Sequence, residues 1–171
     1  MTTAAANTLK TSFVAGRTGP LTETPWSGLV PEDLWASFQT AVSALDQAGV
    51  PFLLHGAIAL ATYTGHWRNT KDIDIIVHPG DHERAIDAIR RAGFEDYFDR
   101  LAYDRSWIFR ALKNDGLIDI IWDLPNHRVP IDHLWFARAW PLHLRGRCYA
   151  AVPPEELVRV KLYVMQRERC D

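Results

Sequence analysis

Apolar positions recur along the chain with two different periods, and these periods predict helices and strands. From Pro31 to Ala48 apolar residues return every three or four positions, as in an amphipathic helix, and Gly49 ends the pattern. Residues 50–54 form a short apolar run typical of a buried strand, and residues 57–61 favour a helix directly after it. The predicted order is helix, strand, tight turn and helix.

The middle of the chain predicts one further strand and one further helix. Residues 72–78 are mostly apolar, and Pro79-Gly80 ends this run as a strand would end. Asp81 can then cap a helix whose apolar face continues to a stop at Gly93.

The remaining pattern predicts a hairpin, a last strand and a last helix. Residues 107–112 and 116–124 have strand character, and the residues between them, Asn114-Asp115 followed by glycine, favour a hairpin turn. Residues 148–152 favour a short strand and residues 155–169 a helix. A hairpin-bearing sheet combined with helices predicts an α+β or mixed α/β fold, a small sheet flanked by helices.

Length and composition predict one domain with a flexible N-terminal arm. The chain has 171 residues, and residues 1–28 are rich in Thr, Ala, Gly and Pro with little periodicity, so we expect an arm there and a domain over residues 29–171. Lys plus Arg number 19 against 21 Asp plus Glu, which favours a small polar substrate over electrostatic binding to nucleic acid or membranes. Two cysteines are too few for a disulfide framework, and no signal peptide or membrane span is indicated, so a cytoplasmic protein is expected.

Two aspartates interrupt the predicted strand at 72–78. Residues two apart on a strand point to the same side, so Asp72 and Asp74 project together. Like-charged carboxylates close together raise each other's pKa, so a cation is expected beside them. Arg68 and Lys71 could supply the positive charge, and so could Mg²⁺. Alone, such a pair is also compatible with a purely structural role.

A third carboxylate is predicted on the second strand of the hairpin. Asp119 lies in an apolar run, where a charge is out of place. If this strand pairs beside residues 72–78, Asp119 converges with Asp72 and Asp74, and three carboxylates can hold two divalent ions. Asp123 has the same parity as Asp119, but its position before Pro125 makes a turn-capping role equally expected.

The turn at Gly56 is a candidate phosphate site. A helix that starts after a glycine presents free backbone N–H groups and a positive dipole end, and glycine allows a phosphate to approach closely. Without the carboxylates the same residues would be an ordinary strand-to-helix turn.

These motifs together resemble the signature of the nucleotidyltransferase superfamily, which has a polymerase-beta-like fold. The matching stretches are Leu54-His55-Gly56-Ala57-Ile58, then Arg68-Asn69-Thr70-Lys71-Asp72-Ile73-Asp74, with Asp119 on a later strand. The stretches look most similar to bacterial nucleotidyltransferases of the minimal and abortive-infection toxin type. Ala57 stands where that superfamily has a second Gly or Ser.

The resemblance implies transfer of a nucleoside monophosphate from a Mg²⁺-bound nucleoside triphosphate to an acceptor, with release of pyrophosphate. It implies Asp72, Asp74 and Asp119 as catalytic residues and ligands of two Mg²⁺ ions, and Gly56, Ala57, Arg68 and Lys161 as nucleotide-binding residues. The acceptor, whether a small molecule, a protein or tRNA, and the oligomeric state are left open. Members usually continue beyond a segment like residues 167–171, so it is also open whether a C-terminal helical part is lacking.

Two rival functions remain at this point. The first is a non-catalytic binding or antitoxin-like module that keeps the fold, and the second is a kinase-like phosphotransfer enzyme. The position of Asp119 discriminates between catalysis and the binding module. Convergence of Asp119 with Asp72 and Asp74 within reach of a metal favours catalysis, whereas a buried or outward Asp119 favours the module.

Overall fold

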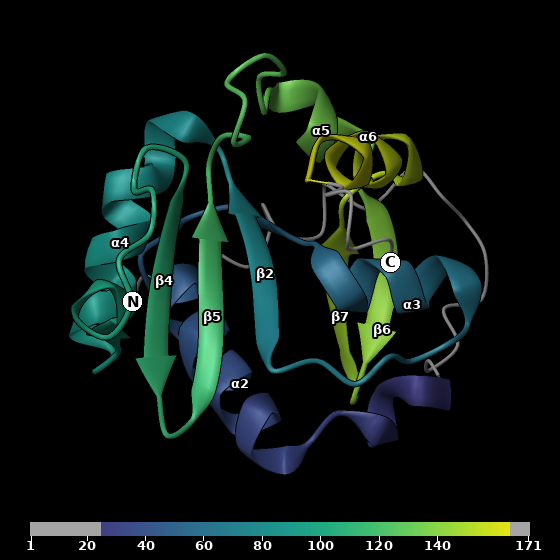
Figure 1. Cartoon of the computed structure of the whole chain (residues 1–171). Helices are drawn as coiled ribbons and strands as arrows, with labels where there is room; N and C mark the ends of the chain where they lie inside the picture. The colour runs from purple at the N-terminus through teal and green to yellow at the C-terminus, as the bar shows by residue number, and fades with distance from the viewer. Residues whose placement is uncertain (1–24, 165–171) are drawn as a thin grey trace, which may run out of the picture.

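A computed structural model describes residues 25–164 of the chain, and in this range the strands form one mixed seven-stranded sheet (Figure 1). The order across the sheet is β3-β4-β5-β2-β1-β7-β6. The strands are β1 (Phe52–Leu54), β2 (Asp72–Val77), β3 (Glu95–Asp96), β4 (Ile108–Lys113), β5 (Gly116–Ile121), β6 (Trp140–Leu144) and β7 (Arg147–Ala151). The predicted mixed α/β class is confirmed.

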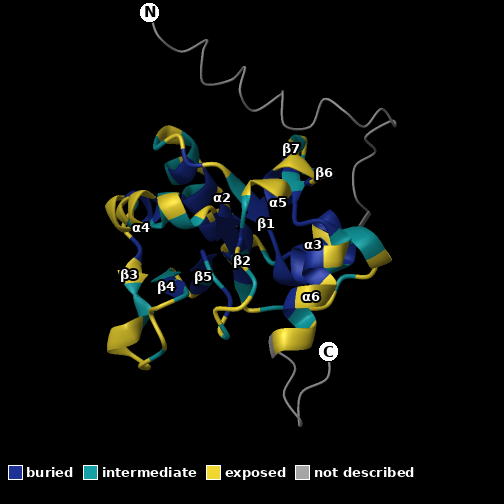
Figure 2. Cartoon of the chain, turned by 90° about the horizontal axis from the view of Figure 1, so that it is seen from above, coloured by how far each residue is buried: buried dark blue, intermediate teal, exposed yellow. Residues whose placement is uncertain are grey.

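Helices cover the sheet from both sides. They are α2 (Glu32–Gln47), α3 (Gly56–Thr64), α4 (His82–Arg91), α5 (His133–Ala137) and α6 (Pro154–Val164), with 3-10 turns η1 (Pro25–Leu29), η2 (Pro79–Asp81) and η3 (Tyr97–Asp99). Helices α2 and α4 pack together on one face, over β5 and β2, whereas α3 and α6 pack together on the other side (Figure 2). On the face opposite α2 and α4, the first turn of α3 reaches β2, and within residues 25–164 no helix lies over β5 and β4 (Figure 1).

Helix α2 forms where the helical period predicts it. Its apolar stripe of Leu34, Phe38, Val42 and Leu45 is buried against the sheet. Pro31 precedes the first turn, and Gly49 follows the helix with a φ of +66°, a conformation that glycine adopts without steric cost. The stripe anchors α2 to one face of the sheet and leaves the other face available.

Strand β2 lies at the centre of the sheet and brings distant segments together. It pairs antiparallel with β1 and parallel with β5, and in the second pairing Asp74 lies directly opposite Asp119. Ile73 and Ile75 are buried, while Asp72 and Asp74 are only half-buried, so the expected alternation along the strand is present. The condition for Asp119 to converge with Asp72 and Asp74, that their two strands pair, is therefore met.

The structure also contains elements that the pattern did not predict, above all β6 and α5. Strand β6 forms a second hairpin with β7 through Arg145 and Gly146, both at positive φ. Asp81 precedes α4 as expected, but its side chain makes no capping hydrogen bond and instead forms an ion pair with Arg84. The predicted extension of the last helix over residues 165–169 lies outside the described residues.

The end of the expected N-terminal arm belongs to η1. Trp26 and Ser27 are buried there, and the Trp26 ring stacks on Trp67 at a centroid distance of 5.4 Å and an interplanar angle of 9°. Residues 1–24 lie outside the described range. Among the helices of residues 25–164, none combines the length and the apolar character needed to cross a membrane.

Candidate active site

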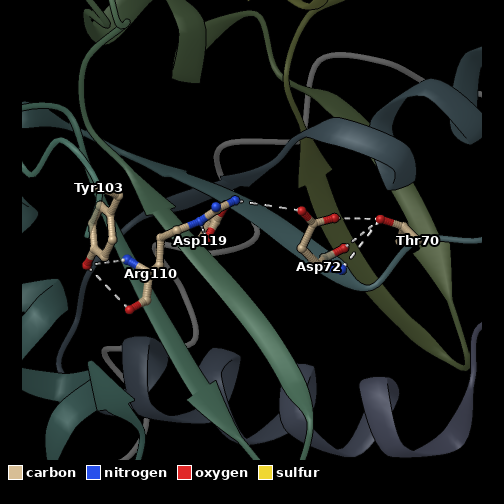
Figure 3. A network of polar contacts seen from close by, with 5 residues as sticks. All are labelled: Thr70, Asp72, Tyr103, Arg110 and Asp119. Carbon is tan, nitrogen blue, oxygen red and sulfur yellow. Dashed lines mark hydrogen bonds and ion pairs between the residues drawn. The ribbon is translucent and has the colours of Figure 1, made fainter. Parts of the chain in front are cut away.

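Three aspartates share the face of the sheet opposite α2 and α4. Asp72 and Asp74 come from β2 and Asp119 from the neighbouring β5, and the parallel register places Asp74 beside Asp119. Figure 3 shows Asp72 and Asp119 pointing to the same side of the sheet. The three charges also influence each other, because Asp119 and Asp72 both raise the pKa of Asp74. The predicted gathering of these residues on one face is therefore present.

Asp119 is held by Arg110 on β4, which the antiparallel register places directly opposite it. Arg110 donates from Nε to Oδ1 at 3.0 Å and from Nη2 to Oδ2 at 2.7 Å, a two-point contact between guanidinium and carboxylate. Asp119 is 2% exposed. Burial raises the pKa of Asp119, and the bonds from Arg110 oppose this effect. The third carboxylate is thus buried and already paired.

Asp72 stands at the more open end of the cluster. Its side chain is 36% exposed, and Oδ1 accepts a hydrogen bond from the Thr70 hydroxyl at 2.5 Å. Nη2 of Arg110 lies 3.9 Å from Oδ2 of Asp72, so the guanidinium sits between Asp119 and Asp72 (Figure 3). The loop before β2 and the hairpin therefore both position this carboxylate.

Asp74 carries a charge that the protein neutralises only in part. The pKa of Asp74 is raised to about 7, first by burial and then by the charges of Asp119 and Asp72. Lys161 and Arg110 act in the opposite direction but do not cancel the effect. A carboxyl group in such surroundings gains from an additional cation.

Gly56 fits against Asp74 at the start of α3. A β-carbon at Gly56 would lie 1.7 Å from Oδ2 of Asp74, and its φ is +58°, so only glycine fits both the space and the backbone here. The backbone N–H of His55 also donates to the Asp74 carbonyl at 3.0 Å. The predicted turn and the aspartate strand are in direct contact.

The first turn of α3 begins at the residues where the sequence predicts a helix start. Gly56 and Ala57 begin the helix, at the end where backbone N–H groups have no helical partner. The His55 ring is 5% exposed, and within residues 25–164 neither of its nitrogens has a hydrogen-bond partner. Its pKa is lowered to about 3, first by burial and second by the charge of Lys161.

Lys161 and Arg68 occupy different positions relative to this cluster. Lys161, on α6, is close enough for its charge to act on both Asp74 and His55. Arg68 is exposed in the loop before β2. Its neighbour Trp67 stacks on Trp26 and so packs against η1.

Asp123, the alternative third carboxylate, has a local structural role. Its Oδ1 accepts from the backbone N–H of Leu124 at 2.8 Å, and its Oδ2 lies 2.7 Å from Nδ1 of His127. It follows the end of β5 and holds the turn there. Of the two candidates, Asp119 is the one that β5 places beside Asp74.

The donor set suits a divalent cation at Asp72 and Asp74. Carboxylate oxygens are ligands that Mg²⁺ prefers. The pKa of Asp74 is raised first by burial and then by the charges of Asp119 and Asp72, and a bound cation would favour the ionised carboxylate against both effects. Across residues 25–164, however, no three acidic, histidine or cysteine side chains are grouped so that they could hold one metal ion. Asp119 shares the face, but its oxygens are directed to Arg110.

Arg110 is the site residue that the sequence-based reasoning missed. Its signal was the same as that of Asp119, namely a charge within the apolar run Ile108, Phe109, Ala111 and Leu112. The two-residue loop Asn114-Asp115 fixes the hairpin register, and counting back from it places Arg110 opposite Asp119. The pairing was therefore accessible from the predicted hairpin.

Comparisons with known proteins place this geometry in context. Among solved structures, the chain is similar to the lincosamide antibiotic adenylyltransferase LnuA bound to lincomycin, with a TM-score of 0.59 and 14% identity over 83% of this chain and 90% of that chain. It is also similar to the antibiotic-resistance factor ANT(2'')-Ia, with a TM-score of 0.57 and 15% identity over 75% of this chain and 69% of that one. At these identities the likeness shows the fold alone.

The family match covers most of the described chain. Among curated proteins none matches the sequence significantly. The model of a family described as uncharacterised nucleotidyltransferases matches residues 33–163, which include all three aspartates, the Gly56 turn and Lys161. By this match the chain belongs to the uncharacterised nucleotidyltransferase family.

Proposed function

We propose that the protein transfers a nucleoside monophosphate from a Mg²⁺-bound nucleoside triphosphate to an acceptor hydroxyl. One observation carries the proposal: Asp72 and Asp74 share the sheet face opposite α2 and α4, and Asp74 contacts Gly56 at the first turn of a helix. A metal-binding carboxylate pair beside a phosphate-binding helix start is the arrangement that a metal-bound triphosphate requires.

The proposed reaction is a displacement at the α-phosphorus. The acceptor oxygen forms a bond to this phosphorus, the bond from it to the bridging oxygen breaks, and pyrophosphate leaves. Asp72 and Asp74 would hold the Mg²⁺ that accompanies the triphosphate. Bound Mg²⁺ neutralises the charge that develops on the phosphate oxygens. The acceptor proton passes to a carboxylate of this cluster.

Nucleotide binding is assigned to the residues that border the carboxylates. The backbone N–H groups of Gly56 and Ala57 would donate to phosphate oxygens, and Lys161 on α6 would balance their charge. Arg68 would contribute from the exposed loop before β2. Lincosamides and aminoglycosides are reasonable small-molecule acceptors to test, because the similar structures hold lincomycin and adenylyl-2''-tobramycin.

One observation favours the alternative of a non-catalytic binding module. Asp119 is buried and paired with Arg110 through both oxygens, so its negative charge already has a partner, whereas a metal ligand and proton acceptor would need that charge for the cation or the proton. To take the roles that the resemblance implies, Asp119 would have to share its charge between Arg110 and a metal ion. A second Mg²⁺ ion would likewise need Asp119 as a ligand.

Transfer assays with differently labelled nucleotides test the proposal. The protein is incubated with Mg²⁺, each of the four nucleoside triphosphates labelled at the α-phosphate, and small-molecule, protein or tRNA acceptors. We expect label in one acceptor class and one pyrophosphate released per transfer. In a parallel assay with nucleotides labelled at the γ-phosphate, label in the acceptor would instead identify a phosphotransferase.

Matched variants connect the activity to the site. Asp72→Asn should abolish transfer, whereas Asp123→Asn, which makes the same change outside the cluster, should retain it. Nucleotide binding without any transfer or pyrophosphate release would exclude the enzyme and support the binding module.

A further inference from the structure

The Arg110 guanidinium lies where a second cation would contact Asp119. Its Nε and Nη2 groups point at the two oxygens of the Asp119 carboxylate at 3.0 and 2.7 Å. The same Nη2 lies 3.9 Å from Oδ2 of Asp72. The positive charge of Arg110 therefore bridges the third carboxylate and the more exposed carboxylate of β2, as Figure 3 shows.

Hydrogen bonds to the backbone of Arg110 also hold this residue in place. Its N–H donates to the Tyr103 hydroxyl at 3.0 Å, and that hydroxyl bonds to Asp96 at 3.0 Å. Asp96 is in turn paired with Arg105. Since these contacts come from the segment before β4 and the hairpin sets the register with Asp119, Arg110 is part of the rigid framework.

The charge of Arg110 limits how many divalent ions can bind to the three aspartates. Arg110 neutralises Asp119, which leaves the charges of Asp72 and Asp74 without a two-point arginine contact. One divalent cation can bind to these two carboxylates, and a second divalent ion at Asp119 would have to approach the guanidinium at close range. Asp119 is 2% exposed, so water screens little of the repulsion between that ion and the guanidinium.

We propose that Arg110 takes the place of the second metal ion, so that the site binds a single divalent cation at Asp72 and Asp74. This inference rests on the proposed function and replaces the two-ion expectation from the sequence. Arg110 then acts as a positioning residue that fixes the charge and the geometry of Asp119.

Counting bound Mn²⁺ tests the stoichiometry directly. The intact protein is titrated with Mn²⁺ in the presence of a saturating non-hydrolysable nucleoside triphosphate, and free Mn²⁺ is followed by electron paramagnetic resonance. We expect one bound ion per chain for the wild type. Arg110→Met should raise the count to two, because it releases both oxygens of Asp119.

Three further variants control the experiment. Arg100→Met removes the same charge from an exposed pair with Glu95 and should leave one bound ion. Arg110→Met combined with Asp119→Asn removes the released carboxylate and should return the count to one. Arg110→Lys, which keeps a charge against Asp119, should also bind one ion and covers the case in which Arg110→Met does not fold.

The outcomes separate this inference from the proposed function. Two ions bound to the wild type would overturn the inference and leave the nucleotidyltransferase proposal standing. A folded Arg110→Met variant that still binds one ion would also overturn it. A wild type that binds no Mn²⁺ with nucleotide present would overturn both.

Discussion

Asp74 is a residue whose surroundings favour ligand binding at the expense of stability. Burial and the neighbouring charges of Asp119 and Asp72 raise its pKa to about 7, and Lys161 and Arg110 compensate only in part. A charge that destabilises the folded chain is typical of functional positions, because the ligand supplies the missing partner. A substitution of Asp74 can therefore measure how much stability this carboxylate costs the metal-free protein.

We predict that Asp74→Asn stabilises the metal-free protein above neutral pH. In the unfolded chain this carboxyl ionises near its ordinary pKa of 3.8, whereas in the folded chain it keeps its proton until about pH 7. Between these values the folded state binds more protons, so the free energy of unfolding falls as pH rises. The variant lacks this loss, and urea unfolding of both proteins across this pH range measures the difference.

Asp123→Asn serves as the control for that measurement, because it removes a carboxylate of the turn after β5 and not of the cluster. If Asp74→Asn melts below the wild type without metal, Asp74 instead supports a stabilising ion pair and the metal assignment fails.

Gly56 and Gly65, at the two ends of α3, allow backbone strain to be separated from the close contact with Asp74. Both have positive φ, +58° and +73°, but only a β-carbon at Gly56 would overlap Asp74, and nothing lies within 4 Å of one at Gly65. Gly65→Ala should cost roughly 1–2 kcal/mol of unfolding free energy from strain alone. Gly56→Ala should cost more and also weaken triphosphate binding, as denaturation and calorimetric titration would detect. Equal costs for the two variants would mean that the contact with Asp74 is easily relieved.

At the scale of elements, local patterns determined most of what the sequence could predict. The β4–β5 hairpin was predictable because Asn114 and Asp115 are suited to the positive φ values of +48° and +65° that they adopt. Strand β6 was missed because Pro141 lowers strand propensity, although an edge position, which β6 occupies, tolerates proline. Helix α5 is a short helix of 5 residues, too brief for a clear period.

The segments at the end of the described chain are held by a buried carboxylate. Glu156 on α6 is 3% exposed in its side chain and forms ion pairs at 2.9 Å with Arg138, after α5, and with Arg159. Either arginine alone can partly compensate the buried charge. The pair with Arg138 joins the end of α5 to α6, the pair with Arg159 lies within α6, and together the two arginines form a redundant clamp on Glu156.

We predict that the two arginines of this clamp are strongly non-additive. Arg138→Ala and Arg159→Ala should each cost about 1 kcal/mol or less, as for partly exposed pairs. The double variant leaves Glu156 buried without a partner and should cost about 3–5 kcal/mol. Urea denaturation of the single and double variants forms a double-mutant cycle, with Arg84→Ala as an exposed control. Additive costs would show that water reaches Glu156 once one arginine is removed.

For the whole molecule, the sheet order explains both the success and the limit of the sequence prediction. The parallel pairing of β2 with β5 brings Asp74 and Asp119 together, and the alternation of apolar residues was enough to predict their common face. The alternation does not predict which charged side chains on one face form ion pairs, because that depends on the distances between them in the folded protein. The main difference between the predicted and the observed site is therefore the pairing of Asp119 with Arg110, and not the bounds of any helix or strand.

Because β2 lies in the centre of the sheet, ligand binding at Asp72 should stabilise the entire fold. A ligand that binds only the folded state, present at about one hundred times its Kd, adds about 2.7 kcal/mol to the free energy of unfolding. Wild type should show this gain with Mg²⁺ and a non-hydrolysable triphosphate, and Asp72→Asn should gain much less. Thermal melts with and without each component test this. If nucleotide without Mg²⁺ gave the full gain in the free energy of unfolding, nucleotide binding would not depend on a metal at the carboxylates.

The stacked rings of Trp26 and Trp67 give the protein an optical property of its own. Two indoles at a centroid distance of 5.4 Å and nearly parallel couple their electronic transitions, and such coupling gives a two-signed band in circular dichroism. Because Trp67 directly precedes Arg68, the amplitude of this band would follow the loop before β2 without any attached label. A spectrum that loses the band in Trp26→Phe would identify its origin, and nucleotide-dependent changes in it would then report on the loop.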